Sequence, residues 1–132
     1  MTDAAQKFDL LETYVKLDDG GSGAIVEVDD AFWQEIDARP QFQYGRLVMK
    51  ARFTSDWPTW EIHPAGPELV LLLEGEVEFV LRVANRDEVV RLERGDTCLV
   101  PTNTWHTARV LAPSEMLFIT PCTGTRNAPQ PE

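Results

Sequence analysis

Both histidines of this chain lie in short patterns that combine histidine, glutamate and glycine at fixed spacing. The patterns, separated by nineteen residues, are Glu61-x-His63-x4-Glu68-x6-Gly75 and Gly95-x5-Pro101-x4-His106. Residues two apart on a β-strand share a face, so Glu61 and His63 would project together. The Pro-Ala-Gly-Pro turn at 64–67 would bring Glu68 back beside His63 at the start of the next strand. This spacing favours a metal site built on β-strands, which His106 would complete from elsewhere in the fold.

The two patterns resemble the motifs of the cupin superfamily, Gly-x5-His-x-His-x3-4-Glu-x6-Gly and Gly-x5-Pro-x-Gly-x2-His-x3-Asn. The positions that match are His63, Glu68, Gly75, Gly95, Pro101 and His106. The positions that depart from the motifs are Glu61 for the first histidine, Ser55 and Asn103 for glycines, and Val110 for the final asparagine. The resemblance covers about residues 45–120. It implies an all-β fold, a double-stranded β-helix of the jelly-roll type, with a metal held in the mouth of the barrel.

The resemblance also implies the ligands of one divalent metal ion, namely Glu61, His63, Glu68 and His106. Two imidazole nitrogens and two carboxylate oxygens suit iron(II), manganese(II) or zinc(II) better than copper(I), and they do not select among the three. A second arrangement stays open, in which Glu61 leaves the metal to the other three residues. Glu61 would then be a general base, and it is the one catalytic residue that we predict.

Three functions remain open for such a site, because the cupin fold carries many unrelated activities. The first is a metal-dependent enzyme, an oxygenase or an isomerase or lyase, that acts on a small molecule. The second is a non-catalytic module that binds a metal or a small molecule. The third is a metal-free cupin similar to the epimerases of sugar nucleotides, with His63 as its base. The glutamate at position 61, where the motif has a histidine, is the best argument for this third function.

Composition narrows the range of partners. The chain has 132 residues, of which 43% are hydrophobic, and this size fits one domain with its own core. A net charge of -10 would repel a phosphate backbone, so we expect no nucleic-acid partner. There is no apolar run of the roughly 20 residues that cross a bilayer, and the first residues lack the pattern of a secretion signal. We therefore expect no membrane association and a cytoplasmic location. The two cysteines are too few for a disulfide framework.

The pattern along the chain predicts three segments. Residues 1–44 would be an extension, with a strand and a short helix from Ala31 to about Arg39, packed on the barrel. Residues 45–120 would be the cupin barrel, in which nearly everything has the alternation of β-strands. Residues 121–132, with two of the chain's prolines after Gly124, would be a loose tail.

One predicted strand, residues 69–73, is apolar on both faces. A strand with one exposed face would not tolerate this pattern, so the N-terminal segment or a second subunit should cover its outer side. Dimerisation through such strands is common in cupins, and we expect a homodimer. The tryptophans Trp57, Trp60 and Trp105 flank the candidate ligands, and by strand parity Trp60 and Trp105 point away from them into the core.

Overall fold

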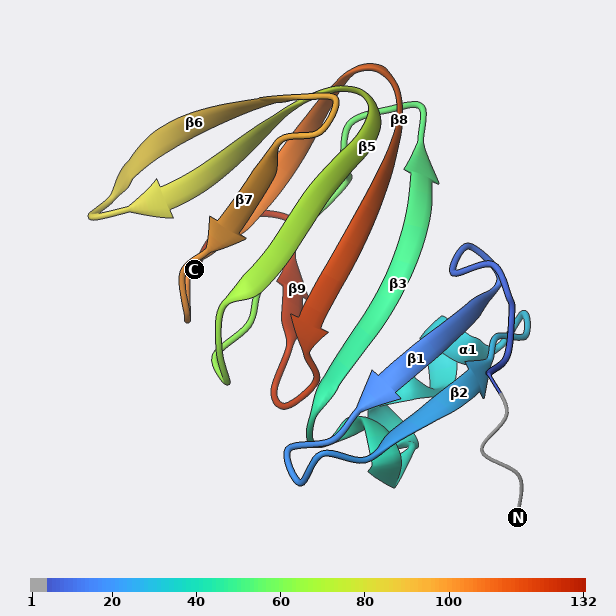
Figure 1. The fold of residues 1–132 in the computed structure, drawn as a ribbon. Coiled ribbons are helices and arrows are strands. Elements are labelled where there is room, and N and C mark those ends of the chain that lie inside the picture. Colours follow the sequence, from blue (N-terminus) through green and yellow to red (C-terminus); the bar gives the residue numbers. More distant parts are fainter. Residues whose placement is uncertain (1–4) are drawn as a thin grey trace.

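A computed structural model describes residues 5–132 of the chain (Figure 1). The strands of this part are β1 (Thr13–Leu17), β2 (Gly23–Glu27), β3 (Arg46–Phe53), β4 (Trp60–Ile62), β5 (Glu68–Val83), β6 (Arg86–Glu93), β7 (Thr97–Val100), β8 (His106–Pro121) and β9 (Arg126–Ala128). The helical elements are α1 (Phe32–Glu35) and the 3-10 turns η1 (Ile36–Ala38) and η2 (Pro40–Phe42). The predicted all-β fold with a short N-terminal helix is confirmed.

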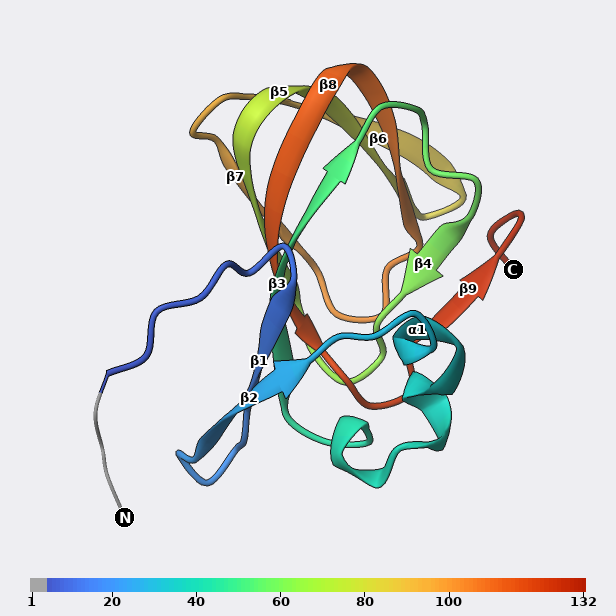
Figure 2. The ribbon, with the colours of Figure 1, turned by 90° about the vertical axis from the view of Figure 1, so that its right-hand side faces the viewer.

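The strands form one antiparallel sheet that doubles over on itself (Figure 2). Its order is β2-β1-β3-β8-β4-β9, and β5 pairs with β6, β7 and β8. The longest strands, β5 and β8, pair with each other twice, on either side of an irregularity at Glu74–Glu76. The first half of β5 also pairs with β7 and its second half with β6, so the two halves belong to different walls of the jelly roll. This architecture confirms the predicted double-stranded β-helix.

Two apolar clusters hold the fold together. The larger fills the barrel and includes Val70, Leu72, Phe79 and Met116, each 0% exposed. The smaller cluster packs the helical segment against β1 and β3 through Tyr14, Phe32, Phe42 and Leu47. Deep burial of aliphatic and aromatic side chains is the main stabilising contribution, at about 1.5–3 kcal/mol for each fully buried side chain.

The N-terminal helix is shorter than the sequence predicted. It was expected to run from Ala31 to about Arg39, but α1 ends after one turn and continues as η1. A helix of this length gains little from its own hydrogen bonds, and the burial of Phe32 anchors it. No helix within residues 5–132 has the length and apolar character that crossing a membrane requires.

The C-terminal residues differ from the loose tail that the sequence predicted. Residues of β9 pair in antiparallel register with Trp60–Ile62 of β4, after a turn at Gly124, whose φ is +74°. The free edge of β4 presents backbone N–H and C=O groups that need partners, and this pairing supplies them. The division into an extension, a barrel and a tail stays a prediction, and residues 1–4 of the extension lie outside the described part.

The strand at 69–73 is the first half of β5. Val70 and Leu72 point into the barrel, whereas Leu69, Leu71 and Leu73 lie half-buried on the outer face of the sheet. The N-terminal segment covers part of this face, where Phe8 and Leu10 lie near Leu117 and the backbone N–H of Lys50 donates to the carbonyl of Leu10. The outer face is therefore apolar and only partly covered within residues 5–132.

Candidate metal centre

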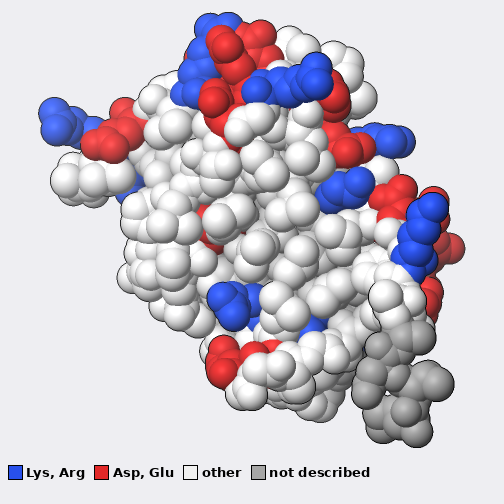
Figure 3. Space-filling model, viewed as in Figure 1, with Lys and Arg blue, Asp and Glu red and all other residues white. Residues whose placement is uncertain are grey.

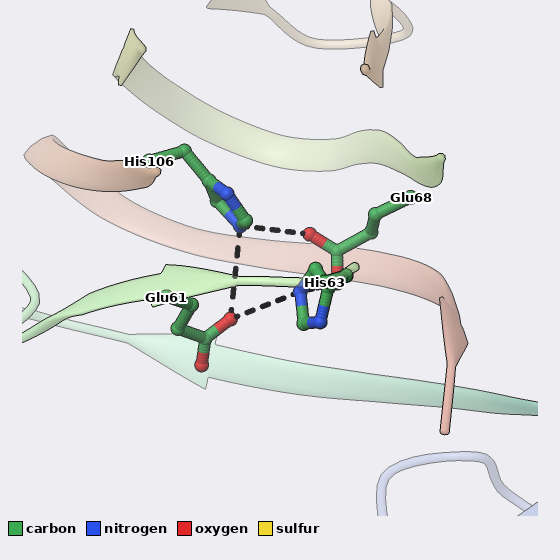
Figure 4. A group of neighbouring side chains, drawn as sticks. All are labelled: Glu61, His63, Glu68 and His106. Atoms are coloured by element: carbon green, nitrogen blue, oxygen red, sulfur yellow. Dashed lines mark ion pairs between the residues drawn. The ribbon is translucent and has the colours of Figure 1, made fainter. Parts of the chain in front are cut away.

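The four predicted site residues converge at one end of the barrel (Figure 4). Glu61 lies on β4 and His63 directly follows that strand, while Glu68 begins β5 and His106 begins β8. Glu61 and His106 are opposite each other in the register of β4 and β8. The turn after His63 returns the chain so that Glu68 lies beside it, as the sequence predicted. Each of the four offers a ligand atom, and these atoms all lie within 4.8 Å of one another.

The closest distances in this cluster join imidazole nitrogens to carboxylate oxygens. The Nε2 of His106 is 3.2 Å from Oε1 of Glu68, and the Nε2 of His63 is 3.3 Å from Oε2 of Glu68. Oε2 of Glu61 is 3.5 Å from the Nε2 of His63 and 3.7 Å from that of His106. Both histidines therefore present Nε2, and not Nδ1, to the two glutamates.

The other ring nitrogen of each histidine, Nδ1, contacts a group outside the cluster. The Nδ1 of His106 lies 3.0 Å from the carbonyl oxygen of Thr104, so it must carry the hydrogen and donate it. The Nδ1 of His63 lies 2.9 Å from the Thr125 hydroxyl, which donates its own hydrogen to the carbonyl of Pro121. Nδ1 of His63 is therefore also the donor. With hydrogen on Nδ1, a neutral imidazole keeps its lone pair on Nε2, which is the form that binds a metal.

Three atoms of the cluster are buried without a hydrogen-bond partner in the described structure: Nε2 of His63, Nε2 of His106 and Oε1 of Glu68. The second oxygen of Glu68 is satisfied, because it accepts a 2.6 Å hydrogen bond from the Thr120 hydroxyl. Buried polar atoms without partners are rare and cost roughly 1–3 kcal/mol each. Lone pairs that face one another at this distance need a proton or a cation between them.

The cluster also perturbs the acidity of its members. Burial alone would lower the pKa of His63, but the carboxylate oxygens of Glu61 and Glu68, 3.5 and 3.3 Å from its Nε2, raise that pKa to about 9 because they stabilise the protonated ring. Burial would raise the pKa of Glu68, but the ring nitrogens of His106 and His63, 3.2 and 3.3 Å from its oxygens, favour the ionised form and lower that pKa to about 2. At neutral pH, Glu68 is therefore ionised. A metal ion that binds here has to displace the proton of His63, so acid weakens metal binding.

Exposure separates Glu61 from the other three residues. The side chains of His63, Glu68 and His106 are 4%, 3% and 0% exposed, whereas that of Glu61 is 30% exposed. Glu61 is therefore the member of the cluster that solvent, or a molecule entering from it, can reach.

Comparisons with known proteins identify the family and the fold. A family model of the cupin domain matches residues 54–120, which are just over half of the chain. The chain belongs to the cupin family. The resemblance predicted from the two motifs is thus confirmed. A comparison with curated protein sequences found no match for this cupin.

Solved structures with similar folds include hydroquinone 1,2-dioxygenase from a Sphingomonas species, with 4-hydroxybenzoate bound. This match has a TM-score of 0.50 and 19% identity and covers 60% of each chain. A cupin-2 domain protein from Shewanella frigidimarina has a TM-score of 0.50 and 17% identity, over 58% of this chain and 70% of the other. A variant of oxalate decarboxylase from Bacillus subtilis has a TM-score of 0.53 and 15% identity, over 60% and 22%. At such identities the likeness shows the fold alone, and this cupin spans less than two thirds of the dioxygenase and of the decarboxylase.

Sequence reasoning did not predict the threonines that support the cluster. Thr104, Thr120 and Thr125 each contact one of its members, yet threonine is too common to stand out in a sequence. Strand parity was the one available signal, because Thr120 continues the inward-facing series of Met116 and Phe118. The prediction for Trp105 agrees with its 8% exposure, whereas Trp60 is only half-buried.

Proposed function

We propose that this cupin is a metal-dependent enzyme that acts on a small organic molecule, most simply as an oxygenase or otherwise as an isomerase or lyase. His63, Glu68 and His106 would hold one iron(II), manganese(II) or zinc(II) ion, with Glu61 beside it. The observation that carries the proposal is a group of four ligand-bearing residues, with ligand atoms within 4.8 Å of one another, in which three buried atoms have no hydrogen-bond partner in the described structure. In a metal-free epimerase these atoms would have to be satisfied by a proton alone, which favours the metal-dependent function.

The distances in the cluster fit a shared ion. Ligand atoms bonded at about 2.1 Å to one ion stand about 3.0 Å apart at right angles and about 3.4 Å apart at tetrahedral angles. The nitrogen-to-oxygen distances here run from 3.2 to 3.7 Å. The charges of two glutamates balance those of a divalent ion, and the Nδ1 contacts orient both imidazoles for binding.

Each residue then has a distinct task. The buried His63, Glu68 and His106 would fix the ion, which when bound supplies Lewis acidity or, as iron(II), one-electron chemistry with dioxygen. Glu61 reaches solvent, so its carboxylate can meet a substrate proton that the buried residues cannot. We propose that Glu61 removes a proton from the bound molecule and returns it after the reaction.

Replacing Glu61 tests this assignment. Glu61→Ala is expected to weaken metal binding only moderately, with about one equivalent retained at saturating metal. Turnover should fall about 100-fold or more, which is the usual contribution of a general base. The assay is a screen of iron-loaded protein for oxygen uptake with small acids and diols, with metal content measured on each sample. Glu78→Ala, which changes a half-buried glutamate on β5, should leave both quantities unchanged.

The outcomes of that screen separate the functions. A loss of metal in Glu61→Ala as complete as in a histidine variant would place Glu61 among the essential ligands and would contradict its role as a free base. A wild type that binds one metal equivalent but turns over nothing in the screen would favour the non-catalytic module.

We further propose that this cupin pairs with a second copy through the outer face of its sheet. Six neighbouring strands each place one aliphatic side chain in the same register row, which we call the aliphatic row: Leu99, Leu69, Ile119, Val48, Val15 and Ile25. Leu99 is 61% exposed and Ile25 39%, and the four between them are half-buried. Figure 3 views this side of the molecule, where charged side chains gather at the rim and the middle is largely uncharged.

The surface that fits the aliphatic row best is the same row on a second copy of the chain. Six strands at about 4.8 Å spacing make it about 24 Å long, which approaches the width of an interface that buries about 800 Å² per partner. The row has one chemical character throughout, so a two-fold rotation about its middle lays it on its counterpart. An uncharged face also lets two chains of net charge -10 approach each other.

A charge placed on the aliphatic row should therefore separate the two copies. Leu99→Asp is expected to convert a dimer to a monomer in light scattering coupled to gel filtration, because the carboxylate would be buried without a partner. The fold should tolerate the change, since Leu99 is exposed in a single chain. Leu111→Asp is the matched control, because Leu111 is 48% exposed and lies outside the row. A wild type that is monomeric at micromolar concentration would refute the proposal, as would a Leu99→Asp variant that stays dimeric.

A further inference from the structure

The interior of the barrel beside the candidate metal centre is walled by aromatic rings. The ring of Trp57 lies 6.3 Å from that of His106, between centroids, and the ring of Phe79 lies 6.4 Å from it. Trp57 also contacts Phe53, Phe79 and Phe118, with centroids 5.5 to 6.0 Å apart. The barrel interior beside the cluster is therefore lined by apolar ring surfaces.

This wall opens to solvent on the side of β3. Met49, Ala51 and Phe53 point toward the barrel core yet remain partly exposed, and so does Trp57 in the following loop. Inward-facing residues on the opposite wall, such as Leu72 and Phe79, are 0% exposed. Solvent therefore reaches the inward-facing side chains of β3 and the ring of Trp57.

One polar atom interrupts the apolar wall. The indole Nε1–H of Trp57 is buried and has no hydrogen-bond partner in the described structure. A buried donor without a partner costs roughly 1–3 kcal/mol. An acceptor on a bound molecule would remove this cost at Trp57. Tryptophan N–H groups usually find a partner when they are buried. The unpaired atoms of the candidate metal centre face one another, and none of them is a hydrogen-bond partner of this N–H.

From these contacts we propose the class of substrate, an inference that rests on the proposed metal site. The site selects a mainly apolar molecule, with one oxygen at the metal centre and a second acceptor toward Nε1 of Trp57. The rings of Trp57 and His106, with centroids 6.3 Å apart, are in contact, so the molecule would lie on the solvent side of Trp57 and not between the two rings. Sugars and other polyols are excluded, because most of their hydroxyls would lie unpaired against the aromatic wall.

Ligand titrations of two proteins test the inference without any turnover. Zinc-loaded wild type and Trp57→Phe, which keeps a ring but loses the N–H, are titrated by calorimetry with benzoate, the three hydroxybenzoates and glycerate. We expect wild type to bind benzoate at least about tenfold more tightly than glycerate, in line with the gain from burying an apolar ring. At least one hydroxybenzoate should bind about fivefold or more tightly than benzoate, the usual value of one hydrogen bond. Trp57→Phe should keep the preference for benzoate over glycerate but erase the hydroxyl's advantage.

The controls separate this inference from the proposed metal site. Trp60→Phe makes the same change on β4, where the ring lies against Arg82, and it should keep the hydroxyl's advantage. Metal content is measured on every sample. Wild type that binds zinc but prefers glycerate would overturn the substrate class alone, and a hydroxyl advantage that survives in Trp57→Phe would overturn the role of Trp57. Wild type that takes up no zinc would overturn the metal site and this inference with it.

Discussion

His106→Ala is expected to abolish stoichiometric metal binding while the fold remains intact. The described cluster has two nitrogen ligands, and the chain has only two histidines, so no other imidazole can replace the lost one. Loss of a residue that merely orients a ligand costs 10–100-fold in affinity, so loss of the ligand should raise the dissociation constant for zinc(II) by about 10³ or more. Calorimetric titration of metal-free protein measures this change, and His63→Ala should behave in the same way.

The control for that result lies on the same strand. Arg109 follows His106 on β8, but its side chain is 51% exposed and contacts Glu78 on the outside. Arg109→Ala should therefore bind one equivalent with wild-type affinity. Far-ultraviolet circular dichroism should show the same strand content for all variants. A His106→Ala protein that is folded and still binds one equivalent with wild-type affinity would remove His106 from the site.

Gly75→Ala is expected to destabilise the fold severely, by roughly 3 kcal/mol or more. Gly75 has a φ of +95°, which strains any other residue, and an added methyl group would overlap the Ser114 hydroxyl and the Pro113 carbonyl oxygen. This glycine lies at the irregularity where β5 and β8 bend from one wall of the barrel to the other. Its substitution should lower the free energy of unfolding measured in urea and lower the yield of folded protein.

Gly95→Ala separates the two causes of that loss. Gly95 has a nearly equal φ of +91°, but nothing lies within 4 Å of an added methyl group. The free energy of unfolding of this variant should therefore fall only by the cost of the backbone conformation, about 1–2 kcal/mol. If Gly75→Ala proves no less stable than Gly95→Ala, the close approach of Ser114 and Pro113 does not constrain the bend.

The sequence predicts the candidate site well because its spacing follows from local geometry. Strand alternation puts Glu61 and His63 together, and the turn that follows them brings Glu68 alongside, with no knowledge of the rest of the fold. His106 could be placed only through the cupin motif, because its register opposite Glu61 depends on how β8 crosses the barrel. Long-range strand pairing of this kind produces no pattern in the residues that are adjacent in the sequence.

The supporting residues were harder to predict for the same reason. Thr125 contacts His63 from a segment that the sequence predicts to be loose, since its composition is typical of coil. That segment is ordered by the open edge of β4, a tertiary effect that intrinsic propensity does not contain. The double-sided apolar pattern of residues 69–73 was likewise visible in the sequence. What lies against the outer side depends on a surface that only the assembled sheet creates.

The metal content of the wild-type protein tests the central claim most directly. Tag-free protein, purified anaerobically at pH 8 so that protonation of His63 competes less with the metal, is measured by elemental analysis. The metal centre predicts about one equivalent of iron, manganese or zinc per chain, either as purified or after reconstitution with each ion. Less than about a tenth of an equivalent under every condition would contradict it. His63 would then lie in a metal-free pocket, with a proton in place of the ion.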